Sequence, residues 1–133
     1  MQKLSFLFLF LLSFTCLNAQ ITLSPEKPGF TEMVTLTYDA TQGNAALEDH
    51  KGDIYAHTGL ITNQSAHAGD WKNVVADWND NKPQLKLARI GKNTYQLQFK
   101  ITELYVVPPD GGIAALTFVF RNEDGSKVGK TAE

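Results

Sequence analysis

The residues best suited to binding chemistry lie in the stretch Gly52–Leu60 and in the pair Trp71 and Lys72, which follows eleven residues later. Alternate side chains of an extended strand face opposite ways. Tyr55 and His57 therefore share one face, and the opposite face carries Ile54, Ala56 and Thr58. One face can pack in a core while the other presents aromatic and polar groups to a ligand.

This combination of side chains suits a sugar ring, which offers C–H groups on one face and hydroxyls around its rim. Tyrosine and tryptophan supply a large apolar surface with a polar tip. Rim hydroxyls need hydrogen-bond partners, since a polar group desolvated without one costs about 1–3 kcal/mol. Four side chains could supply such partners: His57, Asp70, Lys72 and Asn73.

Each aromatic side chain also has a packing interpretation. Tyr55 could be a core or cross-strand residue, and either Trp71 or Trp78 could be the buried tryptophan that many sandwich domains carry. Trp78 is the better candidate for burial, because it continues the alternation of Val74 and Ala76. Trp71 is then the expected exposed binder.

The pattern does not favour metal or catalytic chemistry. The spacings of His50, His57 and His67 match no close-spaced zinc motif. Calcium could bind near Asp77 and Asp80, although carboxylates in such positions usually stabilise turns. No motif places two carboxylates together for hydrolysis. The sequence also contains no serine-elbow motif and no glycine-rich phosphate loop. We expect no catalytic residue, metal or cofactor, and keep a small hydrolytic or metal-dependent enzyme as a third alternative.

Residues 1–19 are predicted to be a secretory signal peptide. Lys3 precedes an apolar run from Leu4 to Phe14, and Ala19 ends a small-residue site, so we expect cleavage before Gln20 and secretion of residues 20–133. The run is too short to span a bilayer, which needs roughly 20 apolar residues. The alternative is a lipoprotein anchor at Cys16.

Removing the leader from the 133-residue chain leaves 114 residues, which is one domain's worth of chain. The sole cysteine goes with the leader, so a packed core must supply the stability. The leader carries one of 12 basic residues and none of 14 acidic ones, so the remainder is 11 against 14, a net charge of −3. That balance argues against nucleic acid as a partner.

Alternating patterns and turn residues predict an all-β domain. Strands are expected at Ile21–Ser24, 33–38, 53–61, 71–78, 85–90, 94–99 and 113–120, with a surface loop at 62–70 and a helical turn within 101–107. The run from Ile113 to Phe120 is almost wholly apolar, which is typical of a strand buried on both sides. The two hairpin strands 85–90 and 94–99 are the clearest local structure.

Six or seven short strands with turns between them predict an antiparallel two-sheet β-sandwich. Few residues follow the turn at Asn122–Gly125, too few for a convincing closing strand. Either the chain is the front part of a longer protein, or one sheet edge is left exposed and prone to pairing.

Three segments resemble the starch-binding carbohydrate-binding modules of families 25 and 26, as found before the catalytic domain of some secreted bacterial α-amylases: Asp53–Gly59, Trp71–Lys72 and Phe118–Gly125. The resemblance implies an immunoglobulin-like sandwich that binds α-1,4-glucans on an aromatic platform. The matching positions are Tyr55, His57 and Trp71. Such a module is not catalytic and holds starch near an attached or partner amylase.

The chain departs from that family after Gly125, where Ser126–Gly129 replaces the usual tryptophan and asparagines. Either binding is weaker at this end, or another group completes the site, with Trp78 as the candidate. The alternative from a different class is an immunoglobulin-like structural or adhesion spacer in which all the aromatic residues are packing residues.

Overall fold

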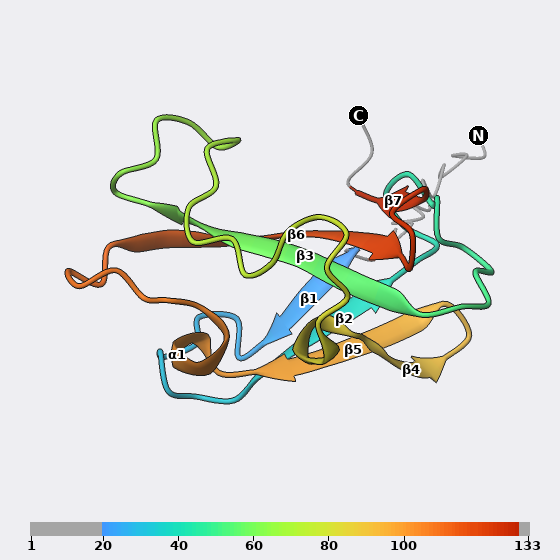
Figure 1. The fold of residues 1–133 in the computed structure, drawn as a ribbon. Helices are drawn as coiled ribbons and strands as arrows, with labels where there is room; N and C mark the ends of the chain where they lie inside the picture. The colour runs from blue at the N-terminus through green and yellow to red at the C-terminus, as the bar shows by residue number, and fades with distance from the viewer. Residues whose placement is uncertain (1–19, 131–133) are drawn as a thin grey trace, which may run out of the picture.

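A computed structural model describes residues 20–130 (Figure 1). The signal peptide predicted at 1–19 lies outside the described residues. The elements are β1 (Ile21–Ser24), β2 (Val34–Asp39), β3 (Ile54–Thr62), the 3-10 turn η1 (Pro83–Leu85), β4 (Ala88–Gly91), β5 (Thr94–Phe99), α1 (Ile101–Leu104), β6 (Ile113–Asn122) and β7 (Val128–Gly129). No helix among these residues is long and apolar enough to cross a membrane.

The strands form two antiparallel sheets, as the alternating patterns predicted. The four-stranded sheet has the order β1-β2-β5-β4, and the three-stranded sheet has the order β3-β6-β7 (Figure 1). The sheet with the first, second, fifth and fourth strands therefore packs face to face with the sheet that holds the third, sixth and seventh. That is the strand order of a constant-type immunoglobulin sandwich. The predicted immunoglobulin-like β-sandwich is confirmed.

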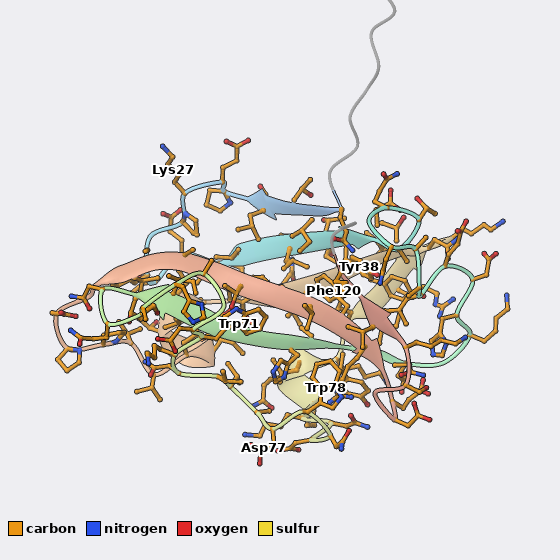
Figure 2. All side chains as sticks on the ribbon, turned by 90° about the horizontal axis from the view of Figure 1, so that it is seen from above. Lys27, Tyr38, Trp71, Asp77, Trp78 and Phe120 are labelled. Atoms are coloured by element: carbon orange, nitrogen blue, oxygen red, sulfur yellow. The ribbon has the colours of Figure 1, made fainter. Side chains whose placement is uncertain are left out.

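The core lies between the two sheets and follows directly from strand alternation. In β2, Val34, Leu36 and Tyr38 are buried, while the threonines between them are partly exposed. Tyr38 stacks on Phe120 of the opposite sheet, with ring centroids 4.0 Å apart and an interplanar angle of 21°. This contact joins the two sheets at the centre of the sandwich (Figure 2).

A buried hydrogen bond ties the segment after β5 to the core face of β3. Thr58 points inward and its hydroxyl lies 2.6 Å from the Tyr105 hydroxyl. Thr58 also donates to the Thr117 carbonyl across the β3–β6 pair, at 2.6 Å. Burial raises the pKa of Tyr105, although the Thr58 contact opposes that shift. A polar side chain in the core is thereby satisfied.

The strand predicted at 71–78 is wrong. Residues 71–87 instead form an irregular covering segment, which includes η1 and runs along the edge of β3. Lys72 pairs with Leu60, the Val75 amide donates to the Thr58 carbonyl at 3.1 Å, and Leu87 donates to Ile54 at 2.9 Å. Asn73 adopts a left-handed conformation with φ 51°, which interrupts an extended path.

Two further expectations need correction. The first hairpin strand begins at Ala88, not at Leu85, because residues Pro83–Leu85 form a 3-10 turn. The strand at Ile113–Phe120 exists and extends to Asn122, but it is not buried on both sides: Ala114 and Ala115 are exposed. The other predicted strands and the helical turn at Ile101–Leu104 lie within one residue of prediction or inside the expected range.

Candidate functional site

The candidate site is the outer face of the β3-β6-β7 sheet together with the covering segment. Tyr55 and His57 of β3 point outward, as predicted, because Ile54, Ala56 and Thr58 face the core. Across the sheet, Tyr55 lies opposite Arg121 and His57 lies opposite Val119. Trp71 and Trp78 reach this face from the covering segment (Figure 2). The structure therefore gathers all four predicted aromatic side chains in one cluster.

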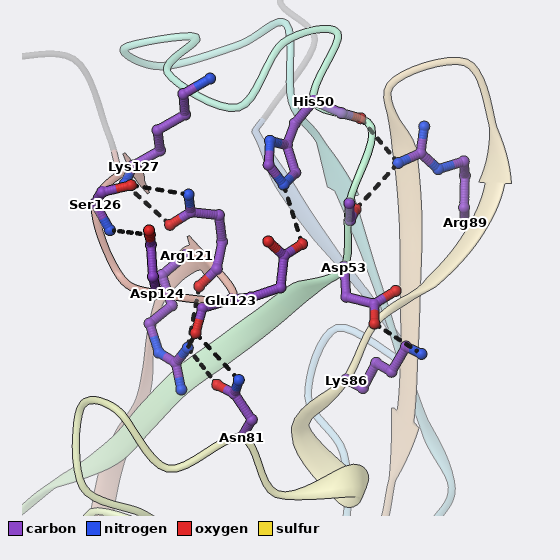
Figure 3. A network of polar contacts seen from close by, with 12 residues as sticks. His50, Asp53, Asn81, Lys86, Arg89, Arg121, Glu123, Asp124, Ser126 and Lys127 are labelled. Carbon is purple, nitrogen blue, oxygen red and sulfur yellow. Dashed lines mark hydrogen bonds and ion pairs between the residues drawn. The ribbon is translucent and has the colours of Figure 1, made fainter.

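Arg121 lies at the centre of this cluster and is 1% exposed. Its guanidinium lies 5.3 Å from the Tyr55 ring centroid and 5.8 Å from that of Trp78. It donates to the Asn81 amide oxygen at 2.7 Å, as Figure 3 shows, and to the Asp80 carbonyl at 3.1 Å. Planar stacking and a fixed fork of donors are properties that arginine has and lysine lacks.

No carboxylate forms an ion pair with Arg121 among residues 20–130. Neutral oxygens take its hydrogen bonds instead, including the carbonyls of Asn122 at 3.1 Å and Glu123 at 3.5 Å. Burial lowers the pKa of Arg121, while nearby Tyr55 and Asp80 oppose that shift. Arginine remains charged in proteins, so this cation joins the covering segment to β6 and the turn that follows it.

Tyr55 is not the exposed binding residue that the aromatic pattern predicted. It is 9% exposed, because Arg121 lies over its ring. The packing interpretation holds for this residue, and its ring helps to fix the guanidinium. The exposed aromatic surface must therefore come from other members of the cluster.

His57, Trp71 and Trp78 supply that surface, and each is partly exposed. The Trp71 indole lies nearly parallel to the His57 ring, with centroids 5.9 Å apart and an angle of 26°. Trp78 meets His57 edge-on, at 4.9 Å and 72°. Neither tryptophan belongs to the core between the sheets, so Trp78 is not the buried tryptophan of a sandwich.

The protonation of His57 follows from this packing. Burial lowers the pKa of His57, and the nearby positive charge of Arg121 lowers it further. The imidazole is therefore neutral at pH 7, with one donor and one acceptor nitrogen. A neutral ring stacked on an indole can accept or donate one hydrogen bond at its edge.

Glycines allow the covering segment to approach the sheet. A side chain at Gly59 would come within 3.1 Å of the Lys72 carbonyl and 3.4 Å of the Trp71 β-carbon. At Gly125, where φ is +74°, a β-carbon would lie 2.6 Å from the Trp78 indole nitrogen. The two tryptophans can lie close to β3 and to the β6–β7 turn because these positions lack side chains.

The polar residues predicted beside Trp71 are close to each other. Lys72 forms an ion pair with Asp70, with the amino group 3.1 Å from the carboxylate. Asp70 also accepts from the Ala66 amide at 2.9 Å, and this hydrogen bond, followed by the Lys72 contact, lowers the pKa of Asp70. Asn73 donates to the Val106 carbonyl, which ties the covering segment to the loop after α1.

An open groove of about 580 Å³ lies beside this end of the site. Lys72 and Asn73 line one part of it, and an Asn63–Asp110 hydrogen bond of 2.7 Å lies within its lining. Val106, 80% exposed, and Pro108 supply apolar surface. The volume of the groove falls in the range of small-ligand sites. Lys72, which lines the groove, directly follows Trp71 in the sequence.

No group of three or more potential metal ligands comes together in the part of the chain that the structure describes. The sequence interpretation missed Arg121 and Asn81 as members of the cluster. One signal was present: Arg121 directly follows the almost wholly apolar run Ile113–Phe120, in a strand expected to be buried. A charged side chain at such a position needs partners.

The fold and the cluster define an immunoglobulin-like β-sandwich domain with an aromatic face outside the core. The chain belongs to the family described as a domain of unknown function, DUF8578, whose model matches residues 21–128. That match covers nearly all of the described residues. No curated protein sequence matches the chain.

Proposed function

We propose that this domain is a non-catalytic carbohydrate-binding module whose ligand is starch or a related α-1,4-glucan. The observation that carries the proposal is the partly exposed Trp71 indole, lying nearly parallel to His57 outside the core. A sandwich core does not need this tryptophan, and Asp70 and Lys72 place polar groups beside it. Flat aromatic surface with adjacent polar groups suits a pyranose ring.

In this proposal the members of the cluster have different roles. Trp71 covers the C–H face of one sugar ring, and Trp78, nearly perpendicular to His57, bounds the surface at its other end. His57 and Lys72 supply hydrogen-bond partners for hydroxyls. Tyr55 supports the site from below by fixing Arg121, which in turn positions Trp78.

The biological role that we propose is accessory. After export by the leader at 1–19, the domain holds glucan near an attached or partner α-amylase and does not cleave it. An open face gains little from burial after the ligand is ordered, so we expect a Kd between about 1 μM and 1 mM. Weak binding suffices, because tethering raises the local substrate concentration.

Affinity electrophoresis in gels with and without soluble starch tests the proposal, with the chain from Gln20 onward. We expect starch to retard the wild type, and Trp71→Ala to weaken binding at least about tenfold, or 1.4 kcal/mol. Ile90→Ala is the control, because Ile90 is a large apolar residue of β4, also exposed, at 53%. Parallel gels with a β-glucan and with pectin test the choice of polysaccharide.

Absence of retardation of a folded chain by starch would refute the α-glucan proposal, and equal loss in both variants would remove Trp71 from the site. The second candidate is an immunoglobulin-like structural or adhesion spacer with no glycan site. The burial of Tyr55 against Arg121 favours it, because that ring is a packing residue. The spacer predicts retardation by none of the polysaccharides.

A further inference from the structure

One edge of β6 has no strand partner over most of its length within the described part of the chain. β3 pairs with β6 from Ile113 to Asn122, on one side. On the other side β7 pairs only with Phe120 and Arg121. Among residues 20–130, no strand occupies the seven positions Ile113–Val119 on that side, which is about 23 Å of strand at 3.3 Å per residue.

The core is open at this edge. Thr58 and Leu60 of β3 face the core and are at most 1% exposed. Their partners on β6, Phe118 and Leu116, share that face but are only partly buried. Exposure ends at Phe120, which is fully buried and pairs with Gly129 of β7. The β3 residues are better buried than their β6 partners because the covering segment flanks β3, whereas none of residues 20–130 pairs with the outer edge of Ile113–Val119.

An apolar groove accompanies the open edge. It has a volume of about 340 Å³ and lies between the β1 side of one sheet and β6 of the other. Its apolar lining includes Leu23, Phe30, Ile101, Ile113 and Leu116. The charged residues of its lining are one acid and one base, Glu26 and Lys27. A strand added to β6 would cover these side chains.

The other edges carry features that block pairing. β1 has four residues and is followed by Pro25, while β4 has four residues, a register shift after Arg89 and a charged side chain. Proteins protect exposed edges with such short strands, prolines, bulges and charges. Residues Ile113–Val119 contain no proline and no charged residue.

We propose that two copies of this chain associate by antiparallel pairing of this β6 edge. A two-fold axis brings the same surface of both copies together. Such an interface is favourable only if like charges on the two copies do not face each other. The edge is uncharged, and its groove carries one charge of each sign, so no like charges oppose each other along the strands. Pairing joins the two three-stranded sheets into one continuous sheet and covers Leu116 and Phe118.

Sedimentation equilibrium of the chain from Gln20 onward, from about 1 to about 100 μM, tests this proposal, because association responds to concentration. We expect the mass to rise to twice that of one chain. Ala115→Lys, at an exposed position of the edge, should remain monomeric throughout. Ala114→Lys is a second variant of the same edge. Ala88→Lys places the same charge on exposed β4 and should dimerise like the wild type.

Hydrogen exchange provides an independent measurement on the wild type. Amide protection in Ile113–Val119 should increase with protein concentration, while the β4 amides should not change. A wild type that remains monomeric at the highest concentration, or oligomers larger than two, would overturn the proposal. If Ala88→Lys dissociates the dimer while Ala114→Lys and Ala115→Lys do not, the contact lies on β4 and the proposal is also overturned.

Discussion

Replacing Arg121 by lysine separates the shape of this buried cation from its charge. Arginine stacks over Tyr55 and Trp78 and donates to four oxygens. Lysine keeps the charge but loses the planar stacking and the fork of donors. We expect the variant to fold, with the covering segment held less firmly against the sheet.

The size of the effect follows from the contacts that Arg121→Lys removes. Each cation–π contact contributes about 0.5–2 kcal/mol, and a hydrogen bond to a charged group contributes about 1.5–3 kcal/mol. Lysine can retain part of the hydrogen bonding. Loss of both stacking contacts and of one net hydrogen bond gives a fall of about 3 kcal/mol in the free energy of unfolding.

Urea denaturation followed by far-UV circular dichroism measures this loss. At about 4–5 °C per kcal/mol for a domain of this size, the Tm should also fall by about 12–15 °C. Arg89→Lys is the matched control. That guanidinium also lies over a tyrosine, 5.1 Å from the Tyr95 centroid, and it donates to two carbonyls, but Arg89 is exposed. We expect the control to lose less than about 1 kcal/mol. Equal losses in the two variants, or a loss below about 1 kcal/mol for Arg121→Lys, would show that burial and stacking of this guanidinium add little to its charge.

Three further predictions concern other contacts. The pKa of His57 is lowered in the folded protein, so folding favours the neutral ring. This contribution to stability is complete above the unfolded-state pKa of about 6.5, and it is lost as the pH falls through the lower pKa of the folded state. Urea midpoints at pH 5 and pH 7.5 should therefore differ less in His57→Gln than in the wild type, and an unchanged difference would contradict this assignment. Tyr105→Phe removes one hydrogen-bond partner of Thr58, which keeps its bond to the Thr117 carbonyl, so we expect the free energy of unfolding to fall by about 1 kcal/mol in urea denaturation. A fall above about 3 kcal/mol would mean that the Tyr105 hydroxyl makes further stabilising contacts. Gly125→Ala forces a β-carbon into a positive-φ position and against Trp78; it should cost about 1–2 kcal/mol by thermal denaturation and weaken starch retardation, and an unchanged Tm would show that the turn adjusts without strain.

Local patterns predicted the strands well where burial alternates within one strand. β2 and β5 follow this rule, because their side chains face the core at every second position. The pattern failed at residues 71–78, where Val74, Ala76 and Trp78 alternate as they would in a strand but belong to the irregular covering segment outside the sheets. Apolar residues covering a sheet and apolar residues within a sheet give similar local sequences, and only the tertiary path separates them.

The aromatic members of the candidate site were predictable from the sequence, but Arg121, Asn81 and the exposure of each ring were not. The outward direction of Tyr55 and His57 follows from alternation within β3, which sequence reveals. The burial of Tyr55 depends on the β3–β6 register, which sets Arg121 directly opposite it. That register is a long-range property, so an analysis of neighbours along the chain could not predict it.

The position of the tryptophans has a spectroscopic consequence. The chain contains two, and both lie on the covering segment, while the core between the sheets is built from tyrosine, phenylalanine and aliphatic residues. Intrinsic tryptophan emission thus reports on residues 71–87 and their contact with the outer face, whereas far-UV circular dichroism reports on the two sheets. If the segment detaches before the sandwich unfolds, emission will change at lower denaturant than circular dichroism, so the natural chain carries its own local probe of the aromatic cluster.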